Sequence, residues 1–253
     1  MGCSVMILAK NEAANIAACI ASCSAFADEV VVIDDFSTDD TKAIAEALPK
    51  TRVLQRALTG DFGAQQSFGI AACREDWVFM IDADERVTPA LSREIEAIVK
   101  KPADRAYWVT RINHFAGQEV RHGPLSPDRV LRLVPRAGTK VEGLVHQKTV
   151  VSVAQAQLSG TMKHYTYRNW EHYERKMVLY STVGAQKYFE SGKRAKPVFD
   201  VVMRPWLAFF KMYVLKRGFL DGTLGWMLCH QYANYTMAKY IKLAELARAK
   251  ERP

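Results

Sequence analysis

The sequence predicts an α/β protein with a mostly parallel, doubly wound sheet and a helical, basic C-terminal region. Through the first hundred residues, short β-branched apolar runs alternate with segments that suit helices. Residues 191–253 lack this alternation. They contain twelve Lys/Arg and four Asp/Glu, so the whole formal excess of +8 lies in the last quarter of the chain.

Four apolar runs are expected as strands, at residues 4–8, 29–33, 52–55 and 77–81. Helices are expected after each of them, at 15–23, 39–48, 64–72 and 89–100. Ser37 and Thr38 are expected to cap the second helix, and Thr88 followed by Pro89 to begin the fourth. Each helix should carry the chain back to the end of the sheet where the previous strand began, so successive strands should run parallel. The crossover connections should be right-handed.

The pattern changes after residue 104. Strands are expected at 106–112, 130–134 and 141–147, and helices at 169–190 and 226–248. Residues 113–127 are rich in Gly, Pro and His and are expected to form a long binding loop or lid.

These elements suggest one domain at 1–190, with halves at 1–104 and 105–168, and a helical basic region at 191–253.

Polar residues follow three of the predicted strands, at Asn11-Glu12, Asp34-Asp35 and Asp82-Ala83-Asp84. Ligands of open α/β sheets bind at the carboxyl ends of the strands, so these groups should meet in one crevice. Asp-Ala-Asp alone suits a solvated turn, but two carboxylates beside other acids can hold Mg²⁺ or Mn²⁺. No glycine-rich phosphate loop follows a strand. The pattern therefore favours a diphosphate that is bridged to the acids by a metal ion.

The five cysteines show neither a metal-ligand spacing nor a disulfide framework, which favours a reducing compartment. No signal-peptide pattern is present at the N-terminus. The longest uncharged stretch, 222–238, contains polar side chains that would be costly in lipid. A cytoplasmic location is expected.

Together these motifs resemble the family 2 glycosyltransferases of the GT-A fold. The matching segments are Ala9-Lys10-Asn11-Glu12, residues 32–39 and Asp82-Ala83-Asp84-Glu85. Five later segments resemble the lipopolysaccharide-core glucosyltransferases of the WaaE/KdtX type, namely 123–124, 129–133, 145–147, 163–165 and 218–222. The resemblance implies an inverting, metal-dependent transfer of a hexose, with glucose expected, from a UDP-sugar to an inner-core sugar, with heptose expected.

The resemblance also implies roles for individual residues. The donor nucleotide sugar would be bound by Ala9, Asn11, Glu12, Asp35, Gln65, Asp82 and Ala83. Among these, Asp35 would accept a hydrogen bond from the base. Asp84 would hold the metal with a late histidine, for which His164 is preferred over His146. An imidazole ligand favours Mn²⁺ over Mg²⁺.

The general base departs from the family pattern. Relatives commonly have His-Glu where this chain has His146-Gln147, and a glutamine cannot accept a proton from the attacking hydroxyl. Three explanations remain open: an engineered Glu→Gln change at Gln147, a neighbouring base at Glu142 or Asp128, or donor binding without efficient turnover.

The basic, aromatic C-terminal region suits the anionic surface of a membrane that carries a glycolipid acceptor. The expected location is then the cytoplasmic face of the inner membrane. The alternative is that its aromatic residues close a core or form a contact between copies in a homo-oligomer. Nucleic acid is not an expected partner.

Two rival functions remain. One is a donor-binding or membrane-docking protein that has lost its base. The other is a sugar-nucleotide pyrophosphorylase, which is disfavoured because Lys10 is the only basic residue in the first loop.

Overall fold

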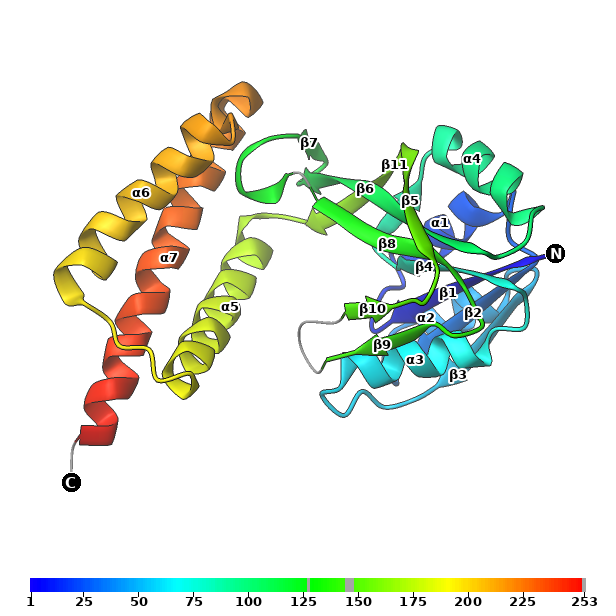
Figure 1. The fold of residues 1–253 in the computed structure, drawn as a ribbon, viewed down its shortest axis with the longest axis horizontal. Helices are drawn as coiled ribbons and strands as arrows, with labels where there is room; N and C mark the ends of the chain where they lie inside the picture. The colour runs from blue at the N-terminus through cyan, green and yellow to red at the C-terminus, as the bar shows by residue number, and fades with distance from the viewer. Residues whose placement is uncertain (127, 144–147, 252–253) are drawn as a thin grey trace. The chain divides into compact units, whose positions relative to one another are not determined.

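The computed structural model describes residues 1–126, 128–143 and 148–251 (Figure 1). The chain divides into two compact units, and each contains two stretches of sequence. Unit 1 contains Met1–Ile112 and Asp128–His164, and unit 2 contains Asn113–Pro127 and Tyr165–Pro253. The division therefore differs from the expected boundary at residue 190, because the helix that ends there packs within unit 2.

Nine strands of the described chain form one mixed sheet, with a parallel part and an antiparallel part. Their order is β3-β2-β1-β4-β8-β6-β11-β5, with β7 paired to β6. The bounds are β1 Cys3–Ala9, β2 Glu29–Asp34, β3 Thr51–Gln55, β4 Trp77–Asp82, β5 Glu85–Val87, β6 Arg105–Phe115, β7 Gln118–Val120, β8 Asp128–Pro135 and β11 Ala154–Tyr167. The first four strands are parallel to one another, as predicted, whereas β8 is antiparallel to both β4 and β6.

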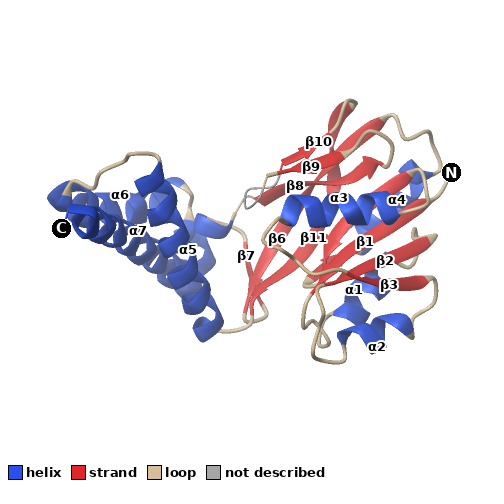
Figure 2. Ribbon diagram, turned by 90° about the horizontal axis from the view of Figure 1, so that it is seen from below, coloured by secondary structure: helices blue, strands red, loops and turns tan. Residues whose placement is uncertain are grey.

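Helices cover both faces of this sheet (Figure 2). They are α1 Ile16–Cys23, α2 Thr41–Glu46, α3 Phe62–Ala72 and α4 Pro89–Val99. Strand alternation separates two cores: Val5 and Ile7 of β1 pack in the core that contains residues of α1, α2 and α4, while Met6 packs with Ile70 of α3. The doubly wound arrangement that the sequence predicts is confirmed.

Of the two helix caps predicted from the sequence, the structure confirms one. The hydroxyl of Thr88 accepts a hydrogen bond from Leu91 N at 3.3 Å, and Pro89 begins α4, as predicted. The prediction for Ser37 and Thr38 was wrong, because Asp40 occupies the N-cap of α2. Ser37 instead donates its hydroxyl to the buried carboxylate of Asp34.

Unit 2 is mainly helical. It contains η1 Gly123–Leu125, α5 Trp170–Glu190, η2 Pro197–Met203, α6 Arg204–Phe210, η3 Lys211–Leu215, η4 Gly218–Asp221 and α7 Gly222–Glu251. Phe115 and Val120 of the β6–β7 hairpin share a core with Tyr173 of α5 and with Leu224 and Leu228 of α7. This core explains why α5 belongs with the C-terminal helices.

The expectation of a long loop at 113–127 was also wrong for the residues that the structure describes. Residues 113–120 form a hairpin, in which Ala116 and Gly117 adopt positive φ angles at the turn. The carboxylate of Asp221 then accepts hydrogen bonds from the backbone N–H groups of Arg121 and His122, at 3.0 and 2.8 Å. These bonds hold the segment against η4 rather than leaving it as a lid.

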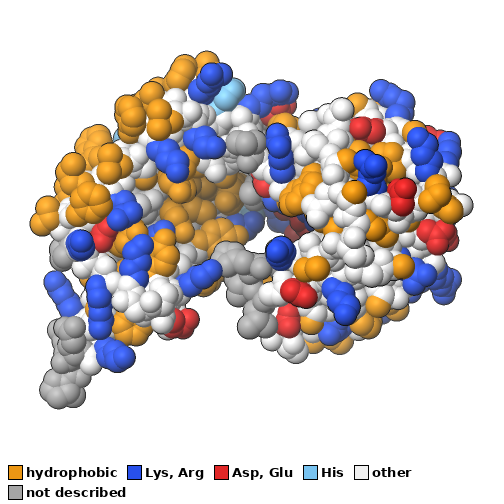
Figure 3. All heavy atoms as spheres, viewed as in Figure 1, with side chains coloured by type: hydrophobic (Ala, Val, Ile, Leu, Met, Phe, Trp, Pro, Cys, Tyr) orange, Lys and Arg blue, Asp and Glu red, His pale blue; other side chains and the backbone are white. Residues whose placement is uncertain are grey.

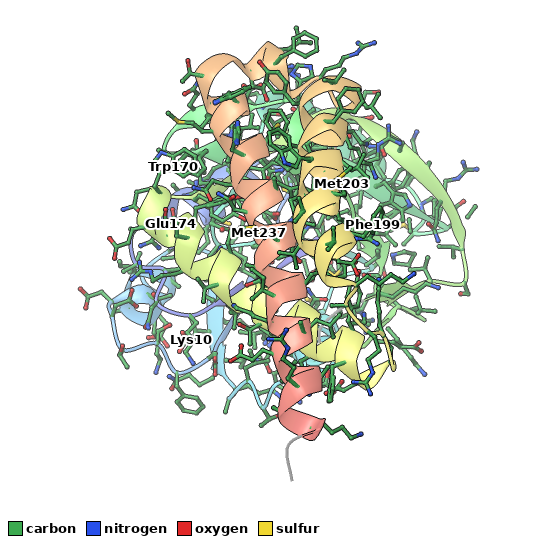
Figure 4. All side chains as sticks on the ribbon, turned by 90° about the vertical axis from the view of Figure 1, so that its left-hand side faces the viewer. Lys10, Trp170, Glu174, Phe199, Met203 and Met237 are labelled. Carbon is green, nitrogen blue, oxygen red and sulfur yellow. The ribbon has the colours of Figure 1, made fainter. Side chains whose placement is uncertain are left out.

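One surface of unit 2 carries many exposed apolar side chains. Figure 3 shows hydrophobic side chains gathered there with Lys and Arg between them, and Figure 4 shows Phe199 and Met203 near Met237 of α7. We call the following exposed residues the apolar face: Val198, Phe199, Val202, Met203, Trp206, Leu207, Phe210, Val214, Leu215, Phe219 and Leu220. In the described residues we find no helix with enough length and apolar character to cross a bilayer.

Candidate functional site

A cavity of about 290 Å³ lies where β1, β2 and β4 end, and we call it the strand-end cavity. The parallel register places Ala9 beside Asp34 and Leu8 beside Asp82, so the polar segments that follow these strands meet. Most residues predicted to bind a donor or a metal line it, namely Ala9, Glu12, Asp35, Gln65, Asp82, Ala83 and Asp84. Of the predicted donor-binding residues, Asn11 is absent from this lining.

Asp35 presents an ionised carboxylate to the strand-end cavity. One oxygen accepts from Lys10 Nζ at 2.7 Å and the other from the backbone N–H of Leu58 at 2.8 Å. Partial burial raises the pKa of Asp35, but the bonds from Lys10 and Leu58 lower it further, so the net shift is downward. A carboxylate has about four lone-pair positions, so Asp35 retains capacity to accept a ligand N–H.

Asn11 shapes the wall from outside the cavity. Its φ angle is 56°, and its side-chain oxygen accepts from the backbone N–H of Thr38 at 2.8 Å. Its own N–H donates to Ser37 Oγ at 2.9 Å. Asn11 therefore ties the loop after β1 to the loop after β2. The side-chain amide of Gln65 is also held by the protein itself, because it donates a hydrogen bond to the carbonyl of Arg56 at 2.8 Å.

The two residues predicted to hold a metal lie together. His164 of β11 pairs in register with Glu85 of β5, and its Nε2 lies 3.5 Å from Asp84 Oδ2. Among the described residues, no group of three or more His, Cys, Asp or Glu could hold a metal ion. One carboxylate and one imidazole fit a cation such as Mn²⁺ if its other ligands come from a substrate.

Two arginines that the sequence reasoning did not single out surround Asp82. Arg132 Nη2 lies 2.6 Å from Asp82 Oδ2 and 2.7 Å from Glu85 Oε1. Arg111 Nη1 donates to the same Glu85 oxygen at 2.9 Å, and Arg111 Nη2 lies 2.6 Å from Asp128 Oδ2. A charged residue within the apolar run at 130–134 was the available sequence signal, because a central strand position that is charged usually has a buried partner.

The network shifts its two central carboxyls in opposite directions. Burial raises the pKa of Asp82, but the neighbouring Arg132 and Arg111 guanidiniums lower it further, so the net shift is downward. Glu85 is fully buried, and for it burial outweighs the attraction of Arg132, so its pKa is raised. The carboxylate of Asp82 therefore stays charged in the lining of the strand-end cavity, and the bond from Arg132 holds its orientation.

A second cavity of about 590 Å³ shares Leu8, Phe62 and Asp82 with the first. We call it the basic cavity, because four cationic side chains and one acid line it among the described residues. These are Arg111, Arg129, Arg132, Lys148 and Asp82. They come from β4, β6, β8 and from β10 Lys148–Val150, which pairs with β9 Lys140–Glu142.

The base candidates are less well placed than the donor candidates. Glu142 is exposed at the end of β9, and Asp128 is already bonded to Arg111. Neither lines the strand-end cavity or the basic cavity. Gln147 and His146 lie outside the described residues.

Sequence comparison places the chain among known transferases. The family model described as Glycosyl transferase family 2 matches residues 4–144. An uncharacterised glycosyltransferase of Rickettsia felis is 31% identical over 96% of this chain and 88% of its own length. The lipopolysaccharide core biosynthesis glycosyltransferase LpsC of Rhizobium meliloti is 29% identical over 93% of this chain and 90% of its own.

Solved structures give weaker matches. TarS of S. aureus in complex with UDP has a TM-score of 0.49 at 16% identity, covering 99% of this chain and 92% of TarS. Glucosyl-3-phosphoglycerate synthase of Mycobacterium tuberculosis, in complex with Mn²⁺, UDP and glucosyl-3-phosphoglycerate, has a TM-score of 0.48 at 20% identity, covering 77% and 81%. The expected GT-A-like architecture, a mixed sheet followed by C-terminal helices, agrees with the strand order described above.

Proposed function

Because this chain belongs to glycosyltransferase family 2, we propose that it transfers a hexose from a UDP-sugar to a sugar of the lipopolysaccharide inner core. The expected donor is UDP-glucose and the expected acceptor sugar is heptose. The observation that carries the proposal is the strand-end cavity, into which the predicted donor residues converge from three parallel strands. The similarity to LpsC, a glycosyltransferase of lipopolysaccharide core biosynthesis, supports the choice of acceptor class.

In this proposal the nucleotide occupies the strand-end cavity. Asp35 accepts the imide N–H of the uracil ring, with Lys10 and Leu58 keeping its carboxylate ionised and oriented. Ala9 and Glu12 line the space for the ribose. A neutral base that lacks this N–H would leave a carboxylate without its partner, so the site would prefer uracil.

Asp84 and His164 would hold a divalent cation at the diphosphate. When bound, that cation supplies positive charge that stabilises the leaving nucleoside diphosphate. Asp82, oriented by Arg132 at 2.6 Å, lies in the wall common to both cavities. We place the sugar that is transferred beside it, with the acceptor entering from the basic cavity.

The direct test is a screen of UDP-sugars, with Mn²⁺, Mg²⁺ or EDTA, for binding and for slow hydrolysis in the absence of an acceptor. Metal-dependent binding of a UDP-hexose is the expected result. A protein that binds no UDP-sugar under any metal condition would contradict the proposed function.

The proton of the attacking hydroxyl needs an acceptor, and the sequence places Gln147 where a glutamate is expected. Gln147→Glu should therefore raise turnover about 100-fold or more, since general bases contribute about 10²–10⁴-fold. The measurement is the rate of UDP release at saturating donor and acceptor, with Gln118→Glu, an exposed position of β7 outside both cavities, as the matched control. Unchanged turnover would move the base to Glu142 or Asp128.

A second candidate function rests on the same residue. If neither substitution nor acceptor choice produces turnover while UDP-sugar binding persists, the protein acts as a donor-binding protein. Gln147 is the feature that keeps this function open.

We also propose that unit 2 binds the cytoplasmic surface of the inner membrane. Its apolar face includes Trp206 at 66% and Leu215 at 67% exposure, and Lys211, Lys216 and Arg217 lie in the same segment. Such side chains enter the headgroup region while the cations attract anionic lipid.

Replacing Trp206 and Phe210 with serine should weaken binding to vesicles with anionic lipid while leaving the fold intact, because both side chains are exposed. Sedimentation with vesicles at two salt concentrations measures the effect, with Phe68→Ser of α3 as the control. A loss of about tenfold is expected for the double variant. Equal binding of wild type and variant would contradict membrane docking through this face.

Deletion of the C-terminal helices is a poor test, because Leu224 and Leu228 belong to the core of unit 2.

A further inference from the structure

We propose that the basic cavity binds an oxyanion carried by the acceptor, a carboxylate or phosphate group attached to a sugar. The inference rests on the proposed transferase function and deepens it, because it names a chemical feature of the acceptor. It follows from the charges that line the cavity and from which of them have partners.

Two of the four cations in the cavity form ion pairs with acids of the protein. Arg111 is matched by Asp128 and Glu85, and Arg132 is matched by Asp82 and Glu85. These pairs are largely internal to the protein and hold the wall of the cavity in place. They leave little charge for a ligand to neutralise.

The other two cations of the cavity differ from these arginines. Arg129 of β8 and Lys148 of β10 line the same cavity, and neither forms an ion pair with any described residue. Both are exposed in the absence of a ligand. The acid in the lining, Asp82, is paired with Arg132 and Arg111. Two cations that reach one cavity from different strands and form no ion pair there suit an incoming anion.

Arg132 adds a third, independent observation. Its side chain is 7% exposed, and its Nε has no hydrogen-bond partner among the described residues. A buried guanidinium N–H without an acceptor is costly. In the wall of the basic cavity, at least one buried N–H donor therefore has no acceptor among the protein's own described groups.

The remaining lining fits a sugar rather than a free inorganic ion. The indole of Trp108, oriented by a 2.8 Å bond from its Nε1 to Gln155 Oε1, gives a flat apolar surface for the C–H face of a ring. Gln66 and Thr149 add neutral polar groups. A volume of about 590 Å³ is large enough for more than one sugar unit.

The diphosphate of the donor is the competing occupant. Asp84 lines the strand-end cavity and not the basic cavity, and His164 lies beside Asp84. The residues proposed to hold the diphosphate through a cation are thus separate from Arg129 and Lys148. This separation allows the two assignments to be tested independently.

The experiment titrates sugars into the protein saturated with UDP and Mn²⁺, so that the nucleotide site is filled. Glucuronic acid, glucose 6-phosphate and neutral glucose are compared by calorimetry, with inorganic phosphate as a fourth probe. At least one anionic sugar should bind about tenfold or more tightly than glucose, since charge-assisted hydrogen bonds are about twice as strong as neutral ones. The preferred anionic sugar distinguishes a carboxylate from a phosphate.

The double variant Arg129→Ala/Lys148→Ala should lose this preference and keep wild-type affinity for UDP. Arg93→Ala/Lys101→Ala removes two cations that line neither cavity and should change nothing. Equal affinity for all three sugars would overturn the inference, as would phosphate binding as tight as that of glucose 6-phosphate, or a parallel loss of UDP affinity in the double variant. A wild-type protein that binds no UDP would overturn the proposed function itself.

Discussion

Asp84→Asn should lower metal-dependent turnover of the UDP-sugar by about 100-fold or more, because it removes the carboxylate proposed to hold the cation at the leaving diphosphate. The amide keeps the shape of the side chain, so the fold should be unaffected. The measurements are the initial rate as a function of Mn²⁺ concentration and the affinity for UDP with and without Mn²⁺.

The matched control for this variant is Asp104→Asn, which changes an exposed carboxylate of the same unit outside both cavities. His164→Ala is expected to reduce the preference for Mn²⁺ over Mg²⁺, because imidazole is the ligand that favours Mn²⁺. If Asp84→Asn retains wild-type turnover and metal response, the assignment of Asp84 and His164 to the cation is wrong.

Arg132→Met should destabilise the protein by about 3–5 kcal/mol, because it leaves Glu85 buried without its main partner. The midpoint of thermal unfolding should fall by about 10 °C or more for a domain of this size. Glu85 has no exposed surface, and Arg132 donates to both of its oxygens, at 2.7 and 2.8 Å. The variant should also lose activity, since Asp82 loses the 2.6 Å bond that orients it.

A double-mutant cycle separates this effect from simple loss of packing. Glu85→Gln/Arg132→Met removes both charges and should be more stable than Arg132→Met alone, so the two changes are not additive. Arg136→Met, which removes an exposed arginine, should change stability by less than about 0.5 kcal/mol. Wild-type stability for Arg132→Met, or strict additivity in the cycle, would show that the network does not hold the site.

The candidate site shows what kind of residue sequence patterns can identify. Ala9 ends β1, and Asp35 and Asp84 lie within two residues of the ends of β2 and β4. The apolar patterns of these strands are clear, and parallel strands end at one edge. Their convergence therefore follows from the chain order. The apolar run around Arg132 suggests a buried partner but does not identify it, because Asp82 lies 50 positions away and on an antiparallel neighbour.

The division into units shows the same limit. The helical pattern at 169–190 predicted α5 correctly, but it could not say which core α5 would join. Tyr173 packs with Phe115 and Leu228, residues that are far from it in sequence. Likewise, the Gly- and Pro-rich stretch after residue 113 suggested a lid, whereas bonds to Asp221 make it part of unit 2.

The sequence by itself determined the parallel half of the sheet, the helices on its two faces and the set of polar residues at the strand ends. It did so because side-chain periodicity and the handedness of crossovers are local rules. Only the tertiary structure decided the ion-pair network around Asp82, the basic cavity beside it and the boundary between the two units. Those features depend on contacts between distant segments, whose pairing no local pattern encodes.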